Sequence, residues 1–146
     1  MSHVLRFLGM FIFIGAGCVT GLTRLPSAHV VFSSGAEFRV EVASTLADRA
    51  HGLSGRKGLA PNEGMLFVFE HPGLYAFWMN EMQFPIDMIW VAEGRVVGIA
   101  ESMPIPQPGI PPALYRPSIP IDRAIELSVG SVQMFGIHVG DEVMMR

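Results

Sequence analysis

The residue whose surroundings point most directly to chemistry is an acid inside an apolar strand. Asp87 lies in the segment Ile86-Asp87-Met88-Ile89-Trp90-Val91, where alternation along a strand puts it on the same face as Ile89 and Val91. A carboxylate on an apolar face must be paired, hydrogen-bonded or protonated. Asp87 is therefore predicted either to serve as a tuned acid or ligand anchor, or to hold backbone donors of a nearby loop.

A cluster of aromatic and thioether side chains comes just before this acid: Tyr75, Phe77, Trp78, Met79 and Met82. Strand alternation places Trp78 on the face opposite Phe77 and Met79, so one face can remain open. An indole close to a carboxylate suits a sugar or another small polar molecule, through stacking and hydrogen bonds. The alternative is a central strand with both faces packed in the core.

Two arginines and a second acid complete the candidate site. Arg49 and Arg56 flank the loop 52–58, which has three glycines, and Glu126 lies on a later strand. A glycine loop with exposed amides can hold an anion, but this loop follows a helix, so a helix end with solvated bases is the alternative. The candidate ligand-binding residues are Arg49, Arg56, Trp78, Asp87 and Glu126.

Three interpretations of these residues stay open. The first is a non-enzymatic module that binds a small polar ligand or a protein partner. The second is a hydrolase-like enzyme in which Asp87 and Glu126 act as an acid and base pair on a saccharide-type substrate. The third is a purely structural protein, and no catalytic residue is assigned.

No metal site and no cofactor are predicted. The histidines His29, His51, His71 and His138 are far apart in the sequence, and no pair has the spacing of zinc ligands. The one cysteine, Cys18, lies near the N-terminus. No serine occupies a nucleophile elbow, so a hydrolase triad has no support either.

The N-terminus has the order of a signal peptide. In residues 1–18 a charged start with Arg6 precedes an apolar run over 7–14 and small residues over 15–17, directly before Cys18. This order predicts export, to the periplasm or to a lipid anchor on the cell envelope. Lipidation of Cys18, simple cleavage and an uncleaved anchor are the alternatives. Residues 19–28 are predicted to be a tether.

Composition limits the class of protein. The chain has 146 residues, of which 50% are hydrophobic, and its 10 basic and 13 acidic residues give a formal charge of −3. This composition predicts one folded domain over residues 29–146 rather than a disordered chain. Because there is no basic run to displace counterions from phosphates, nucleic acid is not an expected partner. Membrane contact is expected only through the N-terminal signal or a lipid anchor.

Short strands separated by turns dominate the remaining sequence. A helix capped by Ser44 or Thr45 is predicted up to Gly52, and Ser131 is predicted to cap one helical turn that ends at Gly136. Short turns at 71–73 and 92–94 predict antiparallel pairing of neighbouring strands, and the proline-rich segment 104–120 predicts a surface loop or flap. The expected fold is mainly β (α+β at most), a small antiparallel β-barrel or sandwich with one or two short helices. Its predicted strands are 29–32, 37–43, 64–69, 74–79, 86–91, 95–100, 123–129 and 142–145.

From about Val40 to the C-terminus the chain resembles a family called domain of unknown function 192. The most specific matching pieces are Gly64-Met65-Leu66-Phe67-Val68-Phe69, Phe77-Trp78-Met79 and Pro85-Ile86-Asp87 before an aliphatic strand. The resemblance implies a compact, mostly β domain that is often exported and has no established activity.

Overall fold

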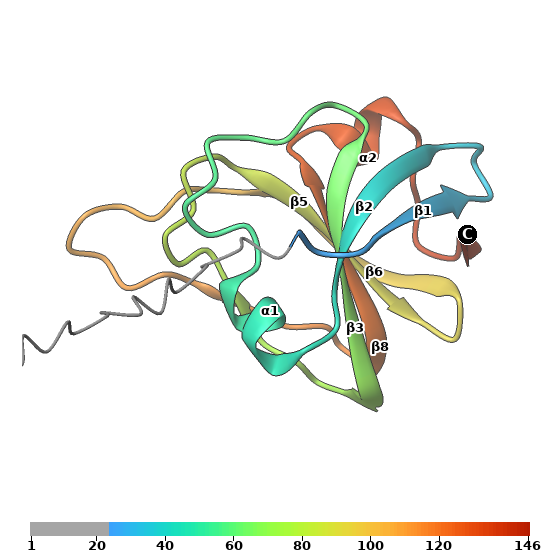
Figure 1. Cartoon of the computed structure of the whole chain (residues 1–146), viewed down its shortest axis with the longest axis horizontal. Helices are drawn as coiled ribbons and strands as arrows, with labels where there is room; N and C mark the ends of the chain where they lie inside the picture. Colours follow the sequence, from blue (N-terminus) through green and yellow to red (C-terminus); the bar gives the residue numbers. More distant parts are fainter. Residues whose placement is uncertain (1–23) are drawn as a thin grey trace, which may run out of the picture.

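The computed structural model describes residues 24–146, and its centre is a strongly curled seven-stranded sheet (Figure 1). The predicted signal segment 1–18, with Cys18, and the first part of the predicted tether lie outside the described residues. In spatial order the strands are β6 (Arg95–Met103), β5 (Ile86–Ala92), β8 (Ile121–Ser128), β3 (Glu63–Gly73), β2 (Glu37–Ala43), β1 (Ser27–Phe32) and β9 (Val143–Met145).

The two edges of this sheet approach each other at one corner. Arg95, at the start of β6, forms an isolated antiparallel bridge with Glu142, just before β9. The amide of Val143 donates to the carbonyl of Gly94 (2.8 Å), and the amide of Val96 donates to the carbonyl of Asp141 (2.9 Å). The sheet is therefore a half-barrel, and the predicted mainly β fold with two short helices is confirmed.

One neighbouring pair of strands is parallel, unlike the expected antiparallel arrangement. β2 and β3 run in the same direction, with Val40 opposite Gly64. Segment 44–62 makes this pairing possible, because it is long enough to return the chain to the same end of the sheet and contains α1 (Leu46–His51).

The predicted hairpin between 64–69 and 74–79 is wrong. β3 continues through the predicted turn to Gly73, which pairs with Ile121 of β8. After it the chain folds back, with the Tyr75 ring stacked on Phe69 at 3.7 Å between centroids. Only β4 (Phe77–Trp78) remains of the second strand, and it pairs with β7 (Leu114–Tyr115) of the proline-rich segment in a separate two-stranded sheet.

Alternation along the central strands divides the core between the two faces of the sheet. Ile89 and Ile125 pack on one side with the phenylalanines of β1 and β2. Met88 and Ala124 pack on the other side with Phe67. The second side carries α1 (Figure 1) and the two-stranded β4–β7 sheet (the β4–β7 ribbon), whose Phe77 and Tyr115 pack with the same cluster.

The two helices follow the predicted positions with one correction. Thr45 caps α1 by accepting from the amide of Asp48 (3.1 Å), and the helix ends at Gly52 with φ of 52°. The helix α2 (Ser131–Met134) is capped by Gly130, with φ of 83°, and not by Ser131 as predicted. A left-handed backbone is needed at this point, and glycine adopts it without steric cost.

Candidate functional site

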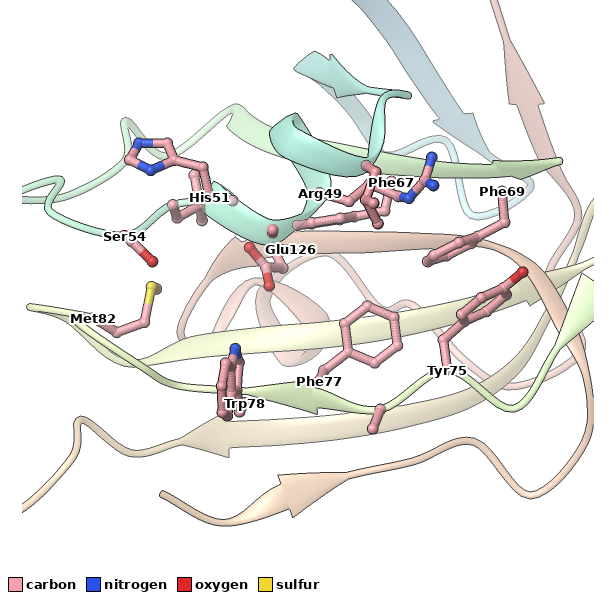
Figure 2. A pocket seen from close by; sticks show the side chains of 15 residues that line it. Arg49, His51, Ser54, Phe67, Phe69, Tyr75, Phe77, Trp78, Met82 and Glu126 are labelled. Carbon is pink, nitrogen blue, oxygen red and sulfur yellow. The ribbon is translucent and has the colours of Figure 1, made fainter. Parts of the chain in front are cut away.

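A cavity of about 360 Å³ lies beneath α1, on the side of the sheet that carries the β4–β7 ribbon (Figure 2). Its walls come from α1 and the loop after it, from β3, from the 75–82 segment and from β8. The lining residues are Leu46, Arg49, Ala50, His51, Gly52, Leu53, Ser54, Phe67, Phe69, Tyr75, Ala76, Phe77, Trp78, Met82 and Glu126.

Four aromatic rings make one continuous wall. Phe67 and Phe69 are two residues apart on β3 and therefore face the same side. Phe77 meets their rings edge-on, at 6.0 Å from Phe67 and 6.3 Å from Phe69 between centroids. Tyr75 stacks on Phe69 and donates its hydroxyl to the carbonyl of His71 (2.7 Å). The wall offers apolar ring faces and edges to a bound molecule.

Glu126 is the only acid that lines this cavity among the described residues, and it is 8% exposed. In the register it lies between Met65 of β3 and Met88 of β5, and Glu41 of β2 is the next residue along the same row beyond Met65. Within residues 24–146, Oε2 of Glu126 is buried and has no hydrogen-bond partner. Burial raises the pKa of Glu126 to about 8, against a weaker lowering by the charge of Arg56.

Arg56 is engaged by another acid. Its Nη1 and Nη2 donate to the two carboxylate oxygens of Glu41, at 2.9 and 2.6 Å. This bond holds the pKa of Glu41 below its ordinary value and raises the pKa of Arg56. Arg56 acts on Glu126 through its charge alone, and it is not among the residues that line the cavity.

Arg49 closes one end of the aromatic wall. Its Nη1 donates to the carbonyls of Ser44 and Val68, the latter at 2.9 Å. Its guanidinium carbon lies 5.2 Å from the centroid of the Phe69 ring, within the range of a cation–π contact. The guanidinium is therefore fixed between α1 and β3.

The other end of the cavity is built by contacts between two loops. The hydroxyl of Ser54 donates to the carbonyl of Asn80 (3.1 Å), and the amide of Gly55 donates to the carbonyl of Glu81 (3.1 Å). The glycine loop is thus tied to the 80–82 segment, and Met82 is held at this end, 8% exposed.

Trp78 stands at the mouth of the cavity. Phe77 and Met79 are buried, whereas Trp78 is 60% exposed, so the open face of this short strand is the one with the indole. Leu114 is opposite Trp78 in the β4–β7 pairing and is also exposed. Leu46 of α1, 79% exposed, adds a third apolar group.

Asp87 lies away from this cavity. It is fully buried, and its two carboxylate oxygens accept from the amides of Ser102 (2.9 Å) and Val132 (3.0 Å). Asp87 is opposite Leu127 on β8, so it shares the face opposite to that of Glu126. Its contacts are those of a carboxylate that holds backbone donors, which is the second of the two roles that its position in the strand predicts.

The structure therefore corrects the proposed acid and base pair. Asp87 and Glu126 lie on adjacent strands but on opposite faces of the sheet, so they cannot act on the same bond. Of the five candidate binding residues, Arg49, Trp78 and Glu126 line one cavity, and Arg56 and Asp87 do not.

Several lining residues were missed by the sequence analysis. Phe67 and Phe69 had a usable signal, since they alternate on one strand face, but their face was not assigned to a cavity. His51 and Ser54 had none, because only the tertiary fold brings them to the same cavity as Glu126.

Neither a metal cluster nor a membrane-spanning helix is found in the part of the chain that the structure describes. No group of three or more His, Cys, Asp or Glu side chains there is arranged to hold a metal ion. No helix in residues 24–146 has the length and apolar character needed to cross a bilayer.

Two crystal structures share this fold. A protein proposed to be a transcription regulator, from Sinorhizobium meliloti 1021, is 28% identical, with a TM-score of 0.77 over 86% of this chain and 98% of that one. A protein of unknown function from Novosphingobium aromaticivorans DSM 12444 is 32% identical, with a TM-score of 0.71 over 87% of this chain and 89% of that one. No curated protein matches the chain.

The family match covers the whole folded region. Residues 29–145 match domain of unknown function 192 (DUF192), described as an uncharacterized ACR. This range includes every strand from β2 to β9, all but the start of β1, and the full lining of the cavity. The chain belongs to the DUF192 family.

Proposed function

We propose that this domain is a non-enzymatic binding module that takes a small organic molecule into the cavity under α1. The observation that carries the proposal is Oε2 of Glu126, a buried carboxyl oxygen that faces an aromatic-lined space without a partner in residues 24–146. Buried polar atoms are normally hydrogen-bonded, so an unpaired one inside a cavity favours a bound donor.

The size and lining of the cavity support a ligand with an apolar body and one polar group. A volume of about 360 Å³ falls in the range of small-molecule sites, roughly 300–1,000 Å³. The rings of Phe67, Phe69 and Phe77 suit a flat body, and Glu126 suits a group that donates a hydrogen bond.

The lining favours binding over catalysis. Within the described lining, Glu126 is the only carboxyl group, so a mechanism with two carboxylates lacks its second member. Nη1 of Arg49 is bonded to two carbonyls, which fixes the guanidinium at the Phe69 end of the cavity. His51 and Ser54 also line the cavity, but Oε2 of Glu126 has no hydrogen bond to either of them or to any other described residue. We therefore assign Glu126 the role of holding a ligand.

A role in transcription regulation, as proposed for the Sinorhizobium neighbour, finds little support in the charges of this chain. Ion pairs with acids hold Arg39, Arg56, Arg95 and Arg123. With a formal charge of −3, such a surface does not favour the phosphate backbone of nucleic acids.

The site of action is also a proposal. We place the domain outside the cytoplasmic membrane, periplasmic or lipid-anchored, on the order of residues 1–18 and the position of Cys18. Fractionation of cells that produce the full chain or its Cys18→Ser variant is the test. Recovery of both from the cytoplasm would contradict export, and equal membrane fractions for both would contradict lipidation.

A thermal-shift screen of the full chain tests the binding function. Sugars, nucleotides, peptidoglycan fragments and ring compounds with one polar group are the probes. We expect one class to raise the melting temperature, with a smaller rise in Trp78→Ala and Glu126→Gln. Glu70→Gln, an exposed position on β3, is the control. No rise with any class, or an equal rise in all variants, would contradict binding in this cavity.

A further inference from the structure

We propose that the group received at Glu126 is the ammonium of a protonated organic amine whose apolar body fills the aromatic part of the cavity. This inference rests on the proposed function and names its ligand class. Two observations support it: no described arginine or lysine contacts the Glu126 carboxyl, and the surfaces near that carboxyl are aromatic or apolar.

The described residues supply no cation in contact with Glu126. Its neighbours in the row across the sheet are the thioethers Met65 and Met88. Arg56 gives both terminal nitrogens to Glu41. When Glu126 ionises, a positive partner in contact with it therefore comes from the ligand, because the guanidinium of Arg56 is bonded to another acid.

The second cation near the cavity is held at the other end of the wall. Arg49 is bonded to two carbonyls and lies over the ring of Phe69. Figure 2 shows its guanidinium beside Phe69, whereas the carboxyl of Glu126 points toward the region between Met82, Trp78 and Phe77. A ligand cation at Glu126 thus occupies the part of the cavity that the guanidinium does not reach.

The surfaces around the carboxyl suit a positive charge. Aromatic faces attract cations, and Phe77 and Trp78 flank the region that the Glu126 carboxyl points toward (Figure 2). An ammonium at Glu126 forms a charge-assisted hydrogen bond, roughly twice as strong as the neutral bond of an alcohol. At pH 8, where a large share of Glu126 is ionised, a ligand carboxylate would bring a second negative charge against it and be repelled.

Binding of an ammonium predicts release of a proton near neutral pH. Burial holds the pKa of Glu126 at about 8, so the free acid is largely protonated at pH 7. The charged or titratable groups around it are Arg56 with its partner Glu41, and Arg49 and His51 of α1. An ammonium stabilises the carboxylate, so the proton leaves and the amine's affinity rises as pH increases toward 8.

Three probes with similar bodies and different head groups test the ligand class: 2-phenylethylamine, 2-phenylethanol and 3-phenylpropanoate. We expect calorimetric titration of the full chain at pH 8 to give the amine an affinity about tenfold or more above the alcohol's, with the acid the weakest. At pH 7 the apparent binding enthalpy of the amine should vary with the ionisation enthalpy of the buffer, corresponding to release of up to about one proton.

Variants separate the ammonium inference from the binding function. Glu126→Gln should lower the affinity for the amine about tenfold or more and that for the alcohol about threefold or less, and the control Glu70→Gln should change neither. An alcohol or acid that binds as tightly as the amine, or amine binding without proton release, would overturn the inference and leave the binding function in place. If none of the three probes binds, the ammonium inference fails, and the binding function is decided by the wider thermal-shift screen. The proton measurement uses the unaltered chain, so it holds even where Glu126→Gln folds poorly.

Discussion

Replacing Glu126 by glutamine removes the buried acid but keeps its shape, and should make the free energy of unfolding less dependent on pH. In the folded chain the pKa of Glu126 is raised from the ordinary 4.5 to about 8. Between these values the folded state keeps a proton that the unfolded state releases. The wild-type protein therefore loses stability as pH rises through this window, relative to a variant with no acid there.

The magnitude follows from the width of that window. Each pH unit within it changes the free energy of unfolding by about 1.4 kcal/mol, so the whole interval has an upper bound of roughly 5 kcal/mol. Because the cavity is open to water, we expect about 2–3 kcal/mol between pH 5 and pH 8.5. The Glu41–Arg56 pair changes stability with pH in the opposite direction, because its stabilisation is lost as pH falls through the lowered pKa of Glu41. This contribution is the same in both proteins and cancels in the difference between them.

Urea unfolding followed by circular dichroism, at pH 5, 7 and 8.5, measures this difference. The free energy of unfolding of Glu126→Gln should be within about 1 kcal/mol of the wild-type value at pH 5 and about 2–3 kcal/mol above it at pH 8.5. The slope of this free energy against urea concentration should be the same for both proteins. Glu70→Gln, exposed on β3, should show no such trend. A stability difference that is the same at all three pH values, or that shifts toward the wild type as pH rises, would refute the assignment of a buried protonated acid.

Three further substitutions test the geometry. Asp87→Asn should lower the free energy of unfolding by about 2–4 kcal/mol, because the NH₂ of the new side chain would face a backbone amide that also donates. A lower melting temperature together with unchanged binding of the probes would confirm a structural role. Gly64→Ala should lower the free energy of unfolding by about 2 kcal/mol or more, because the new Cβ would lie 2.5 Å from the backbone carbonyl oxygen of Glu126. Its control is Gly58→Ala, which has open space around the new Cβ and should leave the free energy of unfolding unchanged in the same urea assay. Trp78→Ala should weaken probe binding about threefold to tenfold in calorimetry with little loss of stability, since Trp78 is 60% exposed. Equal stability of the two glycine variants, or a large stability loss in Trp78→Ala, would contradict the packing described here.

Local patterns predicted most of the secondary structure correctly. Thr45 with Asp48 marked the start of α1, and Gly52 marked its end. Alternation along 86–91 placed Asp87 on the face of Ile89 and Val91, where it is found. These predictions succeeded because capping and strand alternation depend on residues within a few positions of each other.

The same rule explains where sequence analysis failed at the site. Alternation along β8 places Ile125 and Leu127 on one face of the strand and Glu126 on the other. Nothing local indicates that α1 and the aromatic wall cover that face. Leu46 of α1 is 79% exposed although it lines the cavity, so its exposure too depends on the tertiary structure.

The sequence by itself thus determined the mainly β class, the positions of the helices, the family resemblance and the face on which each strand residue lies. Only the tertiary structure decided that β2 and β3 are parallel, that β4 pairs with β7, and that Asp87 and Glu126 are on opposite sides of the sheet. The physical reason is that alternation specifies a direction for a side chain and not its neighbour. Neighbours are set by contacts between segments far apart in the chain, and those contacts made Glu126 a buried acid in an aromatic cavity.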